Sequence, residues 1–246
     1  MTLPVVILAG GQASRLDNYR TVVPKPLMPV GDRAALDLVL RHVANHGFTD
    51  VTLAVGDLAP LIHALFGTGE GLGLSIHYSQ EHEALGTAGV LGLLELDEPF
   101  VVMNGNILTT LDLGALVAAH AASGDTVTVA AHRRSVVADY GVLELSEDAD
   151  GTLVTAYREK PAMSHAVSMG VYVMEPEARD VIATGERLGL PELIERLVAR
   201  GDRVGAYRFD GLWLDLRLRE DYEAAVARYD EIWPLFAGVS ADRTAA

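Results

Sequence analysis

The chain has 246 residues, half of them hydrophobic, and a formal net charge of −15 at pH 7. This composition predicts a folded protein with a substantial core, and the acidic balance argues against nucleic acid as a partner, because phosphate-backbone binding needs a basic face. The absence of cysteine excludes disulfides, zinc–thiolate sites and thiol catalysis. Since no stretch resembles a signal peptide or reaches the ~20 apolar residues of a membrane span, we expect a cytoplasmic protein with no membrane partner.

The first predicted element is a buried strand over residues 4–9, a short apolar run of the kind found in parallel sheets. Gly10 and Gly11 follow at its carboxyl end, where open α/β sheets bind their ligands and where glycine lets backbone N–H groups approach a phosphate. Arg15 can fork two phosphate oxygens, and Lys25 lies between two prolines that restrict its backbone. Together these residues favour a phosphate-binding loop over a glycine turn with two solvated cations.

The rest of the chain alternates between helical and strand patterns before it changes character in the middle. The predicted elements that follow are a helix over 36–43, a strand over 51–55, a helix over 58–66, a strand over 74–78, a helical run ending at 94, a strand over 100–103, strands over 126–131, 142–145, 153–157 and 170–174, helices over 176–183 and 191–200, a strand over 204–209 and a helix over 220–233.

Strands that alternate with helices over the first 125 residues predict βαβ units and a parallel sheet. The middle strands have turns but no helices between them, which favours an antiparallel extension. We therefore expect an α/β fold: a Rossmann-like, mixed but mostly parallel sheet flanked by helices, with a small antiparallel extension over the edge that holds the active site. The predicted organisation is one domain over residues 1–236 and a frayed tail over 237–246.

Seven motifs occur in an order that resembles the sugar-1-phosphate nucleotidyltransferase family, over roughly residues 5–227. The motifs are the first loop with Arg15 and Lys25, Leu85-Gly86-Thr87-Ala88-Gly89, Asn104-Gly105-Asn106, Glu159-Lys160-Pro161, Val167-Ser168-Met169-Gly170, Trp213-Leu214-Asp215 and Glu220-Asp221-Tyr222. Ordered agreement of several motifs is far more specific than any one of them. The chain has none of the hexapeptide repeats that follow this domain in longer relatives, and it looks most like the short bacterial members.

The resemblance implies a transferase that joins a nucleoside triphosphate to a sugar 1-phosphate and releases pyrophosphate. It implies these roles: Ala9, Gly10, Gly11, Gln80, Gly86, Thr87 and Asn106 bind the nucleotide; Arg15 grips the departing pyrophosphate; Lys25 stabilises charge at the α-phosphate; Gly141, Glu159, Lys160, Ser168 and Arg217 bind the sugar phosphate; Asp215 binds Mg²⁺, with Asn106 as a weak second ligand. Taken singly, each residue would be interpreted as an ordinary turn or surface residue, and only the shared order of the motifs favours these roles. Homo-oligomerisation stays open.

The chain departs from the family pattern where the chemistry is expected. Asn106 stands where the pattern has a second metal-binding aspartate, and Arg217 stands where it has a glycine. Magnesium is normally held by one or two carboxylates together with substrate phosphates, so we expect its role to be weakened or dispensable. Arg217 could pair with Asp215 and replace part of the metal's charge, much as arginine fingers act in phosphoryl transfer.

Two functions remain open from the sequence. The first is a working transferase with weakened metal dependence, and the second is a degenerate relative that binds nucleotide or sugar nucleotide as a sensor or partner subunit. An engineered substitution would explain Asn106 alone but not departures in several motifs. Among residues outside the motifs, Glu81 and Glu83 are expected at a solvated loop edge, and Arg133 and Arg134 fit either the border of a sugar pocket or the surface.

Overall fold

The computed structural model describes residues 2–10, 25–57, 59–81, 83–148 and 151–238. A seven-stranded sheet forms its centre, in the order β12 (Val204–Phe209), β8 (Val127–Val137), β11 (Ala162–Met174), β6 (Phe100–Asn104), β1 (Val5–Leu8), β4 (Asp50–Val55) and β5 (Ser75–Gln80). Strands β6, β1, β4 and β5 are parallel to one another, β12 is parallel to β8, and β11 is antiparallel to both of its neighbours. The predicted mixed, mostly parallel sheet is confirmed.

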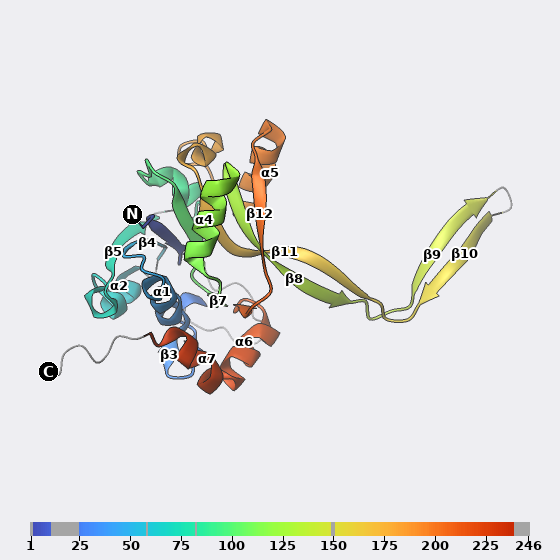
Figure 1. Cartoon of the computed structure of the whole chain (residues 1–246), viewed down its shortest axis with the longest axis horizontal. Coiled ribbons are helices and arrows are strands. Elements are labelled where there is room, and N and C mark those ends of the chain that lie inside the picture. Colours follow the sequence, from blue (N-terminus) through green and yellow to red (C-terminus); the bar gives the residue numbers. More distant parts are fainter. Residues whose placement is uncertain (1, 11–24, 58, 82, 149–150, 239–246) are drawn as a thin grey trace.

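The central strands β1, β4 and β6 are predominantly apolar because both faces of the sheet are covered. Val5 and Ile7 face one core cluster, and Val6 between them faces the other, as alternate side chains of a strand must. Helices α1 (Ala35–Asn45), α4 (Leu113–Ser123), α6 (Arg219–Ala227) and α7 (Tyr229–Phe236) contribute to the first cluster, with α2 (Ala59–Phe66) at its edge. Helices α3 (Gly86–Gly89) and α5 (Leu190–Arg200) contribute to the second, which gives the three-layer body seen in Figure 1.

Several predicted helices differ in detail from those of the structure. The predicted helix over 220–233 is two helices that meet at Arg228, and the second packs Tyr229 against Gly31, where a Cβ would lie 2.4 Å from the tyrosine ring. The apolar period continues across the break because both helices cover the same core. The predicted helix over 176–183 and part of the run ending at 94 are 3₁₀ helices, Pro176–Val181 and Val90–Leu93. Shorter 3₁₀ turns are Lys25–Leu27 and Glu70–Leu72.

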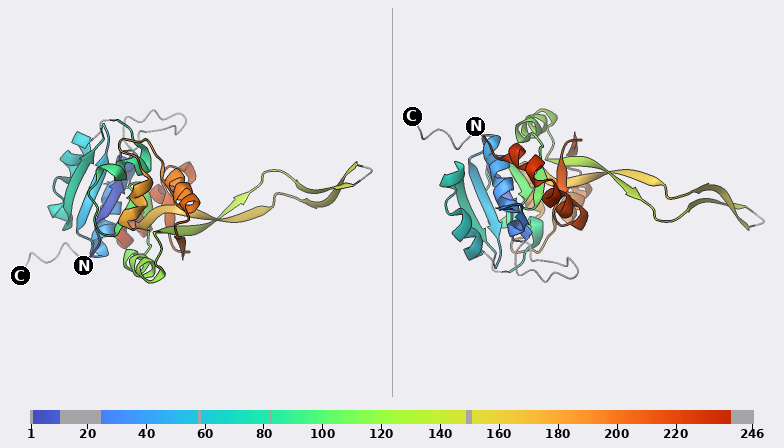
Figure 2. Two further views of the ribbon diagram at one scale, coloured as in Figure 1. Left: turned by 90° about the horizontal axis from the view of Figure 1, so that it is seen from above. Right: turned by 90° about the horizontal axis from the view of Figure 1, so that it is seen from below.

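The antiparallel extension is present and is longer than the sequence suggested. Strands β8 and β11 continue beyond the sheet as a two-stranded ladder, followed by a second hairpin of β9 (Val142–Asp148) and β10 (Gly151–Arg158). We expected this extension to lie over the edge of the sheet that holds the active site. Figures 1 and 2 show instead that it forms an arm that extends away from the body. No helix among the described residues is long and apolar enough to cross a membrane.

Two small antiparallel pairs complete the body. Strands β2 (Pro29–Val30) and β3 (Arg33–Ala34) form a hairpin before α1. Strands β7 (Ile107–Thr109) and β13 (Trp213–Asp215) pair beside the carboxyl end of β6, with Asp215 opposite Ile107. This second pair brings residues separated by more than a hundred positions in the sequence to the ligand-binding edge of the sheet.

Candidate functional site

The carboxyl edge of the parallel strands is built from closely packed glycines. A Cβ on Gly10 would lie 3.0 Å from Glu81 Oε1 and 3.2 Å from the backbone N of Gly56. Gly105 donates its N–H to the carbonyl of Leu8 at 3.0 Å, so the ends of β6 and β1 are held together. The close approach of the strands therefore requires small residues at this edge. Ala9 and Gly10 lie there, at the end of β1.

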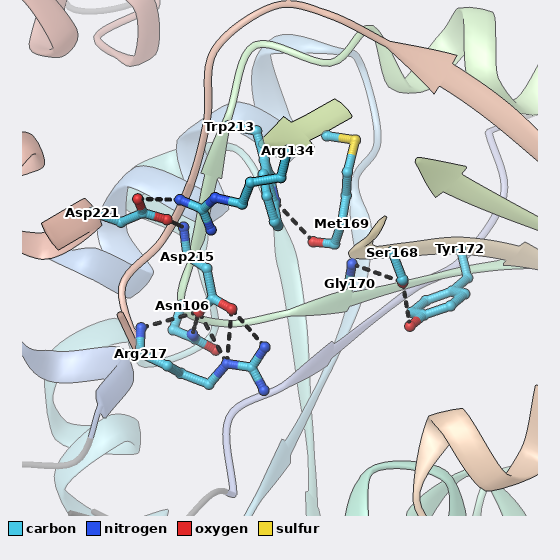
Figure 3. Close-up of polar contacts among 10 residues, drawn as sticks. All are labelled: Asn106, Arg134, Ser168, Met169, Gly170, Tyr172, Trp213, Asp215, Arg217 and Asp221. Carbon is cyan, nitrogen blue, oxygen red and sulfur yellow. Dashed lines mark hydrogen bonds and ion pairs between the residues drawn. The ribbon is translucent and has the colours of Figure 1, made fainter. Parts of the chain in front are cut away.

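Asp215 and Asn106 come together at this edge, as the motif order implied (Figure 3). Asp215 is only 3% exposed, and the side-chain amide of Asn106 donates to its Oδ1 at 3.0 Å. The carbonyl of Asn106 accepts from the N–H of Leu216 at 3.1 Å, which continues the β7–β13 pairing. Both side chains are thus fixed by the short ladder between two distant parts of the chain.

Arg217 covers the same carboxylate from its other side. Its Nε lies 2.9 and 3.0 Å from the two oxygens of Asp215, its Nη2 lies 2.5 Å from Oδ2, and its backbone N donates to Oδ1 at 3.0 Å. Hydrogen bonding to Asp215 raises the pKa of the Arg217 guanidinium. The arginine side chain remains 54% exposed, so the side of its guanidinium that faces away from Asp215 is accessible to a second anion.

The donors around Asp215 do not leave room for a divalent ion held by the protein in this arrangement. A carboxylate has about four lone-pair positions, and the N–H groups of Asn106 and Arg217 already occupy those of Asp215. Asn106 also presents its amide N–H₂, a donor and not a metal ligand, to Asp215. Among the described residues there is no group of three or more His, Cys, Asp or Glu side chains placed to share a metal.

A second layer of side chains holds Asp215 in place. Asp221, 6% exposed at the start of α6, accepts from the backbone N of Asp215 at 2.9 Å and forms an ion pair with Arg134. Arg134 lies 5.0 Å above the Trp213 ring, whose Nε1 donates to the carbonyl of Met169 at 3.0 Å. Asp221 was predicted only as part of a motif with Tyr222, without a role of its own. The sequence analysis places Arg134 either at the border of a sugar pocket or on the surface.

Ser168 also lies at this edge, on an irregular stretch of β11. The β8 ladder breaks between Ser168 and Tyr172, and Gly170 there has a left-handed φ of +75°, with Asn104 so close that a Cβ would lie 2.3 Å from its Nδ2. The Ser168 hydroxyl shares a 2.8 Å hydrogen bond with Tyr172 Oη and accepts from the N–H of Gly170 at 3.3 Å. Burial raises the pKa of the Tyr172 phenol.

The predicted base-binding residues have structural partners. Gly86 has φ +80°, and a Cβ there would lie 2.6 Å from the carbonyl oxygen of Leu188. The Thr87 hydroxyl accepts from the N–H of Leu190 at 2.8 Å, which anchors this loop to the start of α5. Gln80 is exposed at the end of β5. The next residue, Glu81, is not the solvated loop carboxylate that we expected, because it accepts from the N–H of Leu85 at 2.8 Å and burial raises its pKa.

The remaining predicted sugar-phosphate residues lie away from this cluster. Glu159 accepts from Tyr157 Oη at 2.7 Å, and Lys160 forms a 3.6 Å ion pair with Asp139. A Cβ on Gly141 would lie 2.2 Å from that tyrosine oxygen. All three predicted residues lie in the short segments that join β8 to β9 (138–141) and β10 to β11 (159–161), between the two hairpins. Gly11 and Arg15 lie outside the described residues, as does the side chain of Lys25, so their roles stay predictions.

An open, mostly parallel sheet with an arginine-bound aspartate at the carboxyl edge of its strands is typical of α/β proteins that bind ligands at that edge. The chain belongs to the nucleotidyl transferase family, whose model matches residues 4–231. This confirms the family resemblance drawn from the motifs.

Curated relatives include a UTP–glucose-1-phosphate uridylyltransferase of Synechocystis sp., 31% identical over 91% of this chain and 62% of the relative. A mannose-1-phosphate guanylyltransferase of Mycobacterium tuberculosis is 29% identical over 88% of this chain and 62% of the relative. The chain thus spans less than two thirds of the length of these relatives. Among solved structures, a putative glucose-1-phosphate thymidylyltransferase from Bacillus anthracis covers 96% of this chain with a TM-score of 0.74 at 22% identity, which shows a shared fold.

Proposed function

We propose that this chain is a catalytic nucleotidyltransferase that joins a nucleoside triphosphate to a sugar 1-phosphate, or to a similar phosphate, and releases pyrophosphate. The observation that carries the proposal is the Asp215–Arg217 pair beside Asn106 at the carboxyl edge of the sheet. The sugar-1-phosphate transferase names of the relatives support the same chemistry and do not favour a binding-only protein. We further propose that residues 1–236 act as one domain, which the extent of the family match supports.

In the proposed reaction, an oxygen of the sugar phosphate attacks the α-phosphorus in line, and the bond to the leaving pyrophosphate breaks. Little covalent chemistry falls to the protein, so positioning and charge neutralisation supply the rate. The backbone edge at Ala9 and Gly10 supports the nucleotide, with Gln80, Gly86 and Thr87 bordering the base. Arg15 and Lys25 neutralise the triphosphate.

Arg217 has a particular role in this proposal. Its Nε and Nη2 hold Asp215, and its exposed outer edge turns a fixed guanidinium toward the phosphates. A pre-positioned cation in a partly water-excluded site stabilises charge that develops in the transition state. We therefore propose that turnover depends on Mg²⁺ less steeply than a site with two carboxylates would require. The cytoplasmic location expected from the sequence stays a prediction.

The test is pyrophosphate release from each nucleoside triphosphate with a panel of sugar 1-phosphates, measured with Mg²⁺ and with chelator. We expect one pairing to turn over and Asp215→Asn to abolish it. The control is Asp230→Asn, which removes a carboxylate from the first turn of α7. If no pairing releases pyrophosphate while a nucleotide binds tightly, the chain is a binding protein and the proposed reaction is wrong.

A further inference from the structure

The arm, defined as residues 133–168, is tied to the body at its base, where Arg134 pairs with Asp221 and lies over Trp213. Beyond that base its described residues extend away from the body (Figure 2). Its inner part is a continuous antiparallel ladder from Ala162 opposite Val137 to Ser168 opposite Ala131. The same two strands then continue into the central sheet, so the arm is an extension of the core and not a separate loop.

The outer hairpin carries an apolar stripe on one face. Leu145 is paired with Val154, and Leu143 is paired with Tyr157. These four side chains are 47–63% exposed. An isolated two-stranded hairpin is at best marginally stable in water, and a contiguous exposed apolar patch marks an interaction surface. The stripe therefore requires a partner.

Lys160 lies at the joint of the arm, too far along it to meet the Asp215 cluster of its own chain. Strand β11 is extended from Ser168 out to Ala162, which corresponds to roughly 20 Å at ~3.3 Å per residue, and Lys160 lies two residues past that end of the strand. Bringing it back would break the ladder between Ala162 and Ser168. Its φ of +43° is the only positive value at a non-glycine position among the described residues, and such backbone conformations cluster at functional sites.

We propose that two copies of this chain exchange arms about a two-fold axis, so that Glu159 and Lys160 of each copy complete the Asp215–Arg217 site of the other. The inference rests on the proposed function for the role of Lys160, but the exchange itself does not. A two-fold axis makes each copy both donor and acceptor, which closes the assembly. The arm exceeds the 20–30 residues that each side contributes to a typical interface of roughly 1,600 Å².

The charges on the arm favour a second copy over a membrane. Beside the apolar stripe, strand β9 carries Glu144, Glu147 and Asp148, and anionic lipid headgroups would repel these carboxylates. Lys160 at the arm's joint is 56% exposed and suits an anionic sugar phosphate held at the Asp215–Arg217 site of another copy. The proposed exchange would place Lys160 beside the sugar phosphate of the partner's site, and the same contact would cover the apolar stripe.

Because the chain has no cysteine, introduced thiols report the exchange without any activity measurement. Lys160→Cys and Leu218→Cys, the latter next to Arg217 and 46% exposed, are co-expressed on differently tagged copies and treated with a short flexible bis-maleimide. We expect a cross-linked product at twice the 26.3 kDa of the chain. The control pair, Lys160→Cys with Val198→Cys on α5, should give none. Cross-linking only within a single chain carrying both site cysteines would overturn the exchange.

A mass measurement gives an independent test of the stripe. By light scattering, we expect the wild-type chain to be a dimer and Leu145→Asp to be a monomer, whereas Val198→Asp, which alters an equally exposed residue off the arm, should stay dimeric. A monomeric wild-type chain would contradict the proposal.

Mixing two inactive variants then connects the exchange to the reaction. Lys160→Ala and Asp215→Asn each lose turnover, and in a mixed dimer one site contains the intact arm and the intact body. Random mixing should restore about a quarter of wild-type activity, because half of the dimers are mixed and each has one good site. No recovery despite positive cross-linking would mean that Lys160 does not complete the partner's site. An inactive wild-type chain would reject the proposed function and leave the cross-linking result standing.

Discussion

Arg217 holds both carboxylate oxygens of Asp215 through its Nε, at 2.9 and 3.0 Å, and adds a 2.5 Å contact from Nη2 to Oδ2. Asp215 is buried and Arg217 is half exposed, so the pair has a fixed inner end and an accessible outer end. The amide of Asn106 completes the set of donors around the carboxylate. An arginine thus takes up the coordination that a metal ion would need from this aspartate.

Replacing Arg217 with glycine should make turnover more dependent on Mg²⁺. Under the proposed function, the change removes a cation next to the reacting phosphates, and it frees the Asp215 oxygens for a metal. A loss of about 2 kcal/mol, half of a ~4 kcal/mol charge pair, predicts a ~30-fold slower reaction in low Mg²⁺. Pyrophosphate release titrated with Mg²⁺ measures this. Arg219→Gly is the control, since Arg219 makes an exposed pair with Glu223. Equal Mg²⁺ dependence of Arg217→Gly and the wild type would disprove the substitution of arginine for metal.

Asn106→Asp should create a site that needs a cation. The new carboxylate would face Asp215 Oδ1 at the 3.0 Å that now separates it from the amide nitrogen, and two buried like charges repel. We expect a lower melting temperature in chelator, recovery with Mg²⁺, and faster Mg²⁺-dependent turnover. Calorimetry with and without Mg²⁺ measures the first two effects. A melting temperature that does not respond to Mg²⁺ would show that no cation enters between these residues.

Asp221 should act as a positioning residue for Asp215. Asp221→Ala leaves the buried N–H of Asp215 without its acceptor, at a cost of about 1–3 kcal/mol in the free energy of unfolding. Asp221→Asn keeps an acceptor oxygen and should retain most of that stability, although it weakens the ion pair with Arg134. Urea unfolding gives the stabilities, and the pH dependence of turnover separates positioning from a general loss of structure. If the alanine and asparagine variants are equally unstable, the hydrogen bond to Asp215 is not the cause.

His42 should make the fold sensitive to acid. Burial, followed by the neighbouring His46, lowers the pKa of His42 to about 3 from its ordinary 6.5. Because the unfolded chain takes up this proton first, stability is full above pH ~6.5 and falls by up to ~1.4 kcal/mol per pH unit toward pH ~3. His42→Leu should flatten the curve of unfolding free energy against pH over this interval, and His77→Leu at an exposed position should not. Parallel curves for His42→Leu and the wild type would exclude His42 as the acid-sensitive group.

The sequence predicted most elements of the sheet because its strands are buried on both faces and therefore read as continuous apolar runs, such as Val5–Leu8 and Phe100–Asn104. The sequence also predicted that Asn106 and Asp215 share one site. That prediction came from the order of the family motifs and not from any local pattern of residues. It did not find Asp221 as a support for Asp215, since a carboxylate in the first turn of a helix usually interacts with water or the helix dipole.

By itself, the sequence determined the family, the sheet and the departures at Asn106 and Arg217, because motif order and hydrophobic period are written along the chain. Only the tertiary structure decided that Arg217 turns back onto Asp215 and that Lys160 lies on an arm beyond the reach of its own site. The physical reason is that side-chain direction and the course of a paired ladder depend on contacts between distant segments. A local pattern of residues does not contain those contacts.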